Sequence, residues 1–193
     1  MKIFVGTLYS GENEFDECVS SIQSQSYQNY EHFVYKNLPN REAHHTLFKS
    51  FKERSDEFEL LVKVDADMVI CSDHLFADIV KKMIENPKTD VFSIAVWDFF
   101  TGELINGLNT YRSSVDWDFS KDTMFVDEPV VKRGGYYFDQ TELAPAAIHC
   151  KNPSLYQAFH YGVHRGLKSI QREHGTTHWR SEERRVGKEC RSR

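Results

Sequence analysis

The sequence predicts an α/β fold in which helices flank a mostly parallel central sheet. Apolar strand-like runs alternate with amphipathic helical stretches over about residues 1–100, which is the pattern of a parallel sheet covered on both faces. The chain has 193 residues, 40% of them hydrophobic and 13% aromatic, which is enough to bury the core of one domain. Ligands of such folds bind at the carboxyl ends of the strands.

The first strand is expected over residues 2–8, because this stretch is apolar and rich in β-branched side chains. A helix should follow the turn after it, with Asn13 as its N-cap. Phe15, Val19 and Ile22 recur at helical spacing and should form the buried side of this helix.

The next elements repeat this order. Residues 32–35 are expected to form a short strand, Pro39 breaks the following loop, and residues 41–55 have the apolar spacing of a helix. Residues 59–65 give the clearest strand signal, an apolar run that ends in Asp65.

A third helix should begin at Asp73, a favourable N-cap residue, and end before Asn86 and Pro87. Residues 91–97 then predict a fourth strand. Beyond residue 97 the periodicity weakens, and an α+β segment is expected.

Within that segment, short strands are expected at residues 124–126, 136–138 and 146–148. A last helix should start near residues 152–154. One side of this helix carries Leu155, Phe159, Val163 and Leu167.

These elements predict a single domain over residues 1–179, with a nucleotide-binding half at 1–100 and a variable, acceptor half at 101–179. Residues 180–193 differ in composition, because they are rich in Arg and Glu and nearly free of aliphatic side chains. We interpret this tail as non-native or disordered, in preference to a native basic tail. On that interpretation the natural C-terminal end is missing.

Charge and cysteine usage narrow the class of protein. The net charge of −5 argues against a nucleic-acid partner. The four cysteines are widely spaced with no C-x-x-C pair, which argues against a zinc ribbon or a disulfide framework. No apolar run is long enough for a transmembrane segment. We therefore expect a cytoplasmic protein, with peripheral membrane association left open.

Two carboxylates follow the third predicted strand. Asp65 and Asp67 are two residues apart, so on a strand they would lie on one side with a spacing of about 6.6 Å. Buried strands seldom end in two acids without a compensating charge. One divalent cation, Mg²⁺ or Mn²⁺, would compensate both and would also bind a diphosphate. The alternative is that the two acids cap a turn or the next helix.

Three segments together resemble the GT-A glycosyltransferases, and in particular family 2 of the enzymes that use sugar nucleotides. They are the opening strand Ile3-Phe-Val-Gly-Thr-Leu-Tyr9, the signature Gln25-Ser-Tyr-Gln-Asn-Tyr-Glu31 and the D-x-D of Val62-Lys-Val-Asp-Ala-Asp67. The resemblance covers about residues 1–100. It implies a GT-A fold, a nucleotide-sugar donor and a divalent metal ion.

The resemblance also implies roles for individual residues. Thr7 and Tyr9 would contact the base or ribose of the nucleotide, and Asp65 and Asp67 would contact the ribose and the metal-bound diphosphate. The alternative for Thr7 is a structural residue of the core, and the alternative for Tyr9 is a ring that only packs against its neighbours.

One segment departs from the family pattern, because the acidic D-[DG]-x-S motif after the second strand is replaced by Lys36-Asn-Leu-Pro39. Asn37 can hydrogen-bond a base edge in place of the missing carboxylate. The departure leaves the identity of the nucleotide open.

Two further residues complete the expected site. Several GT-A enzymes supply a histidine metal ligand from the region before the last helix, and His149 is the candidate here; a hydrogen-bonded structural histidine is the alternative. Asp127 is the preferred catalytic base, since it follows a short apolar strand. The alternative for Asp127 is a solvated surface acid.

The expected function is metal-dependent transfer of a sugar from a nucleotide-diphosphate donor to a glycan or lipid-linked acceptor, with inversion. Two other functions stay open: a non-catalytic module that binds sugar nucleotides, and a sugar-phosphate nucleotidyltransferase. The second would usually show a glycine-rich phosphate loop after the first strand, which this sequence matches poorly.

Overall fold

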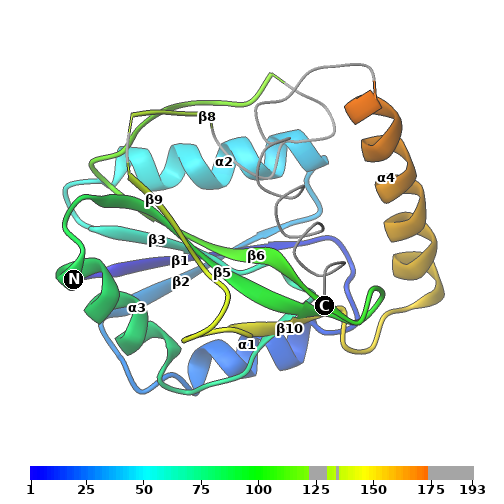
Figure 1. Ribbon diagram of the computed structural model, residues 1–193, viewed down its shortest axis with the longest axis horizontal. Coiled ribbons are helices and arrows are strands. Elements are labelled where there is room, and N and C mark those ends of the chain that lie inside the picture. The colour runs from blue at the N-terminus through cyan, green and yellow to red at the C-terminus, as the bar shows by residue number, and fades with distance from the viewer. Residues whose placement is uncertain (122–129, 134, 174–193) are drawn as a thin grey trace, which may run out of the picture. The chain divides into compact units, whose positions relative to one another are not determined.

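The computed structural model describes residues 1–121, 130–133 and 135–173 (Figure 1). The elements run in this order: β1 (Ile3–Tyr9), α1 (Phe15–Gln23), β2 (Tyr30–Lys36), α2 (Asn40–Glu53), β3 (Leu60–Lys63), β4 (Met68–Ile70), α3 (Leu75–Glu85), β5 (Thr89–Asp98), β6 (Glu103–Arg112), β7 (Asp116–Asp118), β8 (Val130–Arg133), β9 (Gly135–Asp139), β10 (Ala147–His149) and α4 (Leu155–Glu173).

The main sheet has the strand order β2-β1-β3-β6-β5-β10-β4, and β9 also pairs with β5. Strands β1, β2 and β3 are parallel, while β6 is antiparallel to both of its neighbours, β3 and β5. Strands β9 and β10 run parallel to β5, and β4 runs antiparallel to β10. Only β6 and β4 therefore oppose the common direction, and the predicted mostly parallel α/β sheet is confirmed.

Each face of the sheet packs against its own helices (Figure 1). Side chains alternate along a strand, so Ile3 and Val5 point to one face of β1 and Phe4 points to the other. The first face packs against the apolar sides of α1 and α3. The second packs against α2 in an aromatic cluster that includes Phe48 and Trp117.

The elements predicted for residues 1–97 all form, with ends that differ by a few residues. Both predicted helix caps are wrong. Helix α1 is preceded by Glu14 and α3 by His74, and neither residue makes a side-chain cap hydrogen bond. Asn13 instead donates from Nδ2 to the carbonyl of Asn152, which anchors a distant segment.

In the second half, the strands expected at residues 136–138 and 146–148 form as β9 and β10. The strand expected at residues 124–126 lies outside the described residues. Strands β4, β6, β7 and β8 were not predicted. In strand β6, Asn and Gly interrupt the apolar residues and hide the period of two. A three-residue strand such as β4 is too short for a periodicity signal.

The chain divides into two compact units, Met1–Gln157 and Ala158–Arg193. The described part of the second unit is helical, and it belongs to α4. Its apolar side chains Phe159, Val163, Leu167 and Ile170 are exposed. No helix in the described part of the chain combines the length and apolar character that crossing a membrane requires.

A β-bulge at Gly107 shapes the centre of the sheet. The register between β5 and β6 shifts between Ile94 and Ala95, so that Gly107 has no partner opposite it. A Cβ atom on Gly107 would lie 2.3 Å from Cγ2 of Val96, a fully buried side chain. Glycine is required here because nothing larger fits beside Val96.

Replacing Gly107 with alanine is expected to lower the free energy of unfolding by about 1–3 kcal/mol, because the added methyl group overpacks the core. Chemical denaturation followed by circular dichroism measures this change. Gly162→Ala is the matched control, since a Cβ on Gly162 meets nothing within 4 Å and alanine favours a helix. Equal stability of Gly107→Ala and the native protein would contradict the overpacking argument.

Candidate functional site

The two acids of the D-x-D lie just beyond the end of β3. The strand ends at Lys63, so the prediction that it extends to Asp65 is wrong. Pairing with β1 nevertheless continues, because the Val64 amide donates to the carbonyl of Gly6 and the Ala66 amide donates to that of Leu8. Asp65 and Asp67 therefore occupy the carboxyl edge of β1 and β3, where a parallel sheet binds its ligands.

The two carboxylates point to different partners. Asp65 accepts a hydrogen bond from Nζ of Lys63 at 2.7 Å, and the Lys63 side chain is only 3% exposed. A buried ammonium needs such a counter-charge. Asp65 is itself about one third exposed. It therefore neutralises Lys63 and still presents its outer side to solvent.

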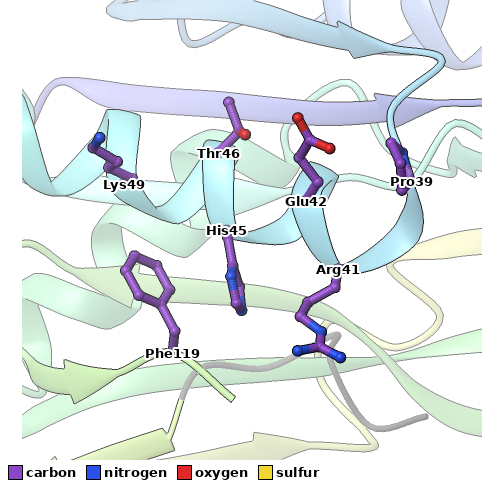
Figure 2. Close-up of a pocket in the computed structure, with 7 residues that line it drawn as sticks. All are labelled: Pro39, Arg41, Glu42, His45, Thr46, Lys49 and Phe119. Carbon is purple, nitrogen blue, oxygen red and sulfur yellow. The ribbon is translucent and has the colours of Figure 1, made fainter. Parts of the chain in front are cut away.

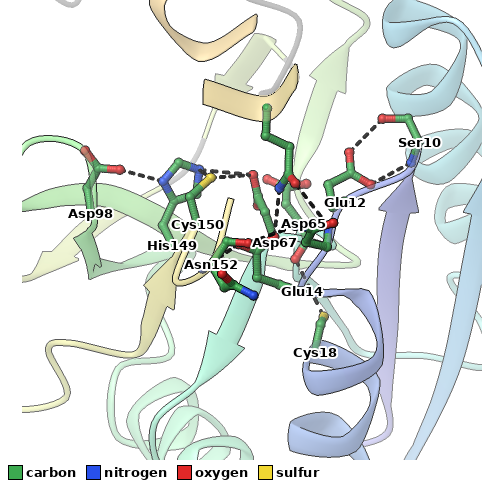
Figure 3. A network of polar contacts seen from close by, with 12 residues as sticks. Ser10, Glu12, Glu14, Cys18, Asp65, Asp67, Asp98, His149, Cys150 and Asn152 are labelled. Carbon is green, nitrogen blue, oxygen red and sulfur yellow. Dashed lines mark hydrogen bonds and ion pairs between the residues drawn. The ribbon is translucent and has the colours of Figure 1, made fainter. Parts of the chain in front are cut away.

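Asp67 belongs to a separate cluster with His149 and Cys150 (Figure 3). Oδ2 of Asp67 lies 3.2 Å from Nε2 of His149 and 3.3 Å from Sγ of Cys150. Sγ of Cys150 is 3.6 Å from the same histidine nitrogen. One carboxylate, one imidazole and one thiol thus converge on a common point at the edge of the sheet.

Asp98 holds the other side of the His149 ring (Figure 3). Its Oδ1 lies 2.7 Å from Nδ1 of His149, and its Oδ2 accepts hydrogen bonds from the amide and hydroxyl of Thr101. The Asp98 side chain is fully buried. The imidazole is therefore fixed between two carboxylates, with Nε2 directed at Asp67.

These contacts shift the ionisation of the cluster. Burial opposes charge on His149, but hydrogen bonds to Asp67 and Asp98 raise its pKa far above the usual range. Burial likewise opposes charge on Asp67, but the hydrogen bond and charge of His149 lower its pKa. Burial raises the pKa of Cys150 to about 12. In the metal-free protein, an imidazolium therefore lies between two carboxylates next to a neutral thiol.

The backbone brings these side chains together through β10. This strand pairs with β5, where His149 lies opposite Asp98, and with β4, where His149 lies opposite Met68. The Cys150 amide donates to the carbonyl of Asp67 at 2.8 Å. Cys150 has a φ of 52°, a backbone conformation that residues other than glycine seldom adopt. This turn directs its thiol back toward Asp67.

A second contact ties the segment after β10 to the start of α1. Glu14 is buried, and its carboxylate accepts hydrogen bonds from the amide of Asn152 at 2.8 Å and from Nε2 of Gln157 at 2.7 Å. A neighbouring ion pair joins Glu17 to Lys151 at 2.7 Å, with both side chains about half exposed. Glu14 thus anchors the segment that follows His149 and Cys150.

The residues predicted to contact the nucleotide lie at the ends of β1 and β2. Thr7 is buried, and its hydroxyl lies 2.9 Å from Nε2 of His32. The ring of Tyr9 packs on Phe15 with centroids 4.2 Å apart. Asn37 has a φ of 56° and donates its amide to the carbonyl of Tyr9. Tyr9 and Asn37 therefore adjoin, while the hydroxyl of Thr7 faces the interior.

Asp127, the predicted base, lies outside the described residues. A separate cavity of about 510 Å³ lies against the outer surface of α2 (Figure 2). None of the predicted site residues lines it. Its lining consists of Pro39, Arg41, Glu42, His45, Thr46, Lys49 and Phe119.

Sequence reasoning did not assign a role at this site to Lys63, Cys150 or Glu14, and it treated Asp98 only as one of several acids that could act as a base. Some signals were present. Asp98 follows an apolar strand as Asp65 does, Cys150 adjoins His149, and Lys63 interrupts a buried strand. The pairings of Asp98, Cys150 and Glu14 depend on contacts between distant segments, which spacing alone does not reveal. The Lys63 pairing is local, since Asp65 lies two residues further along the chain.

Comparisons with known proteins give distant structural matches. No protein-family model matches the chain, and no curated protein matches it. Among solved structures, a protein from STIV is 13% identical with a TM-score of 0.45, over 58% of this chain and 65% of its own. S. aureus TarS is 14% identical with a TM-score of 0.45, over 74% of this chain and 37% of its own.

A third structure is described as a glycosyltransferase involved in the glycosylation of the major capsid of PBCV-1. It is 9% identical with a TM-score of 0.40, over 56% of this chain and 59% of its own. The chain therefore spans less than two thirds of each of these three structures. Identities and TM-scores this low assign neither a family nor an activity.

The Glu14 anchor yields a test of its own. Glu14→Ala should lower the free energy of unfolding by about 1–3 kcal/mol, because it leaves the Asn152 amide and the Gln157 side chain without their acceptor. Glu17→Ala is the matched control, and it should cost at most about 1 kcal/mol because its ion pair is exposed. Urea denaturation of both variants measures the difference, and equal losses would show that Glu14 is no anchor.

Proposed function

We propose that the protein is a metal-dependent glycosyltransferase of the GT-A type that moves a sugar from a nucleotide-diphosphate donor to a glycan or lipid-linked acceptor, with inversion. The observation that carries this proposal is the position of Asp67 and His149, side by side at the carboxyl edge of a mostly parallel sheet. Charged groups at that edge are where α/β folds bind phosphorylated ligands.

Asp67 and His149 offer oxygen and nitrogen ligands that a divalent cation such as Mn²⁺ or Mg²⁺ can take. In this proposal Asp67 and His149 hold the cation, and Asp65, which stays partly exposed, contacts the ribose or the cation from the other side. The cation would stabilise the negative charge that develops on the leaving diphosphate. Lys63 balances Asp65 and so limits the repulsion between the two acids.

The nucleotide would lie over the ends of β1 and β2. Tyr9 offers a ring beside Asn37, whose side chain can hydrogen-bond the edge of a base. Nζ of Lys36 lies 5.7 Å from the centre of the Tyr9 ring, and it would provide positive charge near the expected diphosphate. Thr7 would support Tyr9 from within β1. Asp127 remains the proposed base for the acceptor hydroxyl.

Isothermal calorimetry with a panel of nucleoside diphosphate sugars, with and without Mn²⁺, tests donor binding. We expect at least one donor to bind more tightly when Mn²⁺ is present, and a donor-hydrolysis assay should then detect turnover. Metal-linked binding without turnover would instead favour a sugar-nucleotide-binding module. Absence of any metal-linked binding would contradict the proposal.

Asp67→Asn should abolish metal-dependent turnover while leaving the fold intact, because the amide cannot replace the carboxylate as a charged ligand. Circular dichroism checks the fold, and the donor-hydrolysis assay measures the loss. Asp56→Asn is the matched control, since Asp56 is an exposed acid remote from the sheet edge. Full activity of Asp67→Asn would exclude this site assignment.

A further inference from the structure

The three donor atoms beside β10 form a triangle with sides of 3.2, 3.3 and 3.6 Å. These atoms are Oδ2 of Asp67, Nε2 of His149 and Sγ of Cys150. A tetrahedral zinc ion has bonds of about 2.0–2.2 Å to oxygen and nitrogen and about 2.3 Å to sulfur, which places its ligand atoms roughly 3.3–3.6 Å apart. The three sides therefore lie within about 0.3 Å of the spacing of three ligands around one tetrahedral ion.

The chemistry of the donors points the same way. Mg²⁺ requires oxygen ligands in octahedral geometry, at bond lengths that place neighbouring ligands about 3.0 Å apart. A thiol suits Zn²⁺ and other borderline-soft ions, and carboxylate or water ligands suit Mg²⁺ and Mn²⁺. Cys150 thus changes the preference that the two acids of the D-x-D alone would give.

We propose that Asp67, His149 and Cys150 form a three-ligand tetrahedral site for Zn²⁺ or a similar transition-metal ion, with Cys150 bound as the thiolate. Two protons are released to solvent when the metal binds, one from the Cys150 thiol and one from Nε2 of His149. The fourth position stays open, as in sites where a metal ion binds an exchangeable ligand. Asp65 remains paired with Lys63 and is not a ligand in this arrangement.

Two features of the surroundings support a built site. Asp98 binds Nδ1 of His149 and so directs Nε2 toward Asp67 and Cys150, and a carboxylate behind a ligating histidine is the usual arrangement in metal proteins. Asp98 is thus a positioning residue. The hydrogen bond between the Cys150 amide and the Asp67 carbonyl joins the two turns that carry these ligands.

One carboxylate oxygen of the cluster also supports a bound cation. Oδ1 of Asp67 is buried and has no hydrogen-bond partner among the described residues, a costly situation for a carboxylate oxygen. A bound cation would compensate this charge. The His149 side chain is 14% exposed and that of Asp67 is 21% exposed, so an ion can reach the cluster from solvent.

This inference concerns the metal of the proposed glycosyltransferase and rests on that function only for the premise that the site takes a metal. Metal binding is measurable without a sugar nucleotide, so the two proposals can fail separately. If the cluster binds Mn²⁺ only together with a nucleoside diphosphate and the thiol takes no part, the function stands and this inference falls.

The test is a titration of the tag-free, metal-free protein with Co²⁺, the spectroscopic substitute for Zn²⁺. We expect one equivalent to produce intense visible bands of tetrahedral cobalt and a near-ultraviolet band from thiolate-to-cobalt charge transfer. Zn²⁺ should displace the cobalt and remove both. If the native protein binds cobalt without a thiolate-to-cobalt band, or shows no such band at all, the inference is wrong.

Two cysteine variants assign the band. Cys150→Ser keeps a hydrogen-bond donor for Asp67 but should lose the charge-transfer band and weaken Zn²⁺ binding by at least about tenfold. Cys71→Ser, which changes an exposed cysteine, should keep both properties. A band that persists in Cys150→Ser would show that another cysteine binds the metal, and the assignment would be wrong.

Discussion

The pairing of β10 between β4 and β5 is the contact on which the site depends. This strand has only three residues, yet it places His149 opposite Asp98 on one side and opposite Met68, the residue after Asp67, on the other. Backbone hydrogen bonds on both flanks set the positions of two acids and one imidazole. Strand pairing therefore positions Asp98 and His149, while the turns next to these strands position Asp67 and Cys150.

Charge balance explains how the two neighbouring acids coexist. Each carboxylate has its own cationic partner, Lys63 for Asp65 and protonated His149 for Asp67. The two partners differ in kind, because an imidazole can exchange its proton for a metal ion whereas an ammonium nitrogen has no lone pair to offer one. Asp65 is thus a permanent part of the charge balance, and Asp67 is the group whose partner can change.

Sequence patterns predicted the half of the fold that rests on local periodicity. Strand β1, strand β3 and helix α3 carry apolar residues at regular spacing, and they form close to where they were expected. Strand β6 was missed because it is antiparallel and mixes Asn, Gly and Thr with apolar side chains. Its pairing depends on β3 and β5, which flank it in space, and short sequence windows carry no information on that.

The sequence likewise predicted only part of the site. The sequence indicated that Asp67 and His149 belong to one site, and the structure brings them within 3.2 Å. It did not indicate that Lys63 would engage Asp65 or that Cys150 would face Asp67. The first contact joins residues only two apart in the sequence. The second arises from tertiary geometry, since it requires the segment after β3 to meet a turn more than eighty residues later in the chain.

The left-handed turn at Cys150 has a consequence for evolution. If backbone shape alone mattered, glycine or asparagine would serve better at this position, because both tolerate positive φ at lower cost. A lineage that keeps cysteine there accepts a conformational penalty in return for the sulfur atom. Replacing Cys150 with glycine would preserve the bend and remove the sulfur atom, so this substitution separates the two roles of the position.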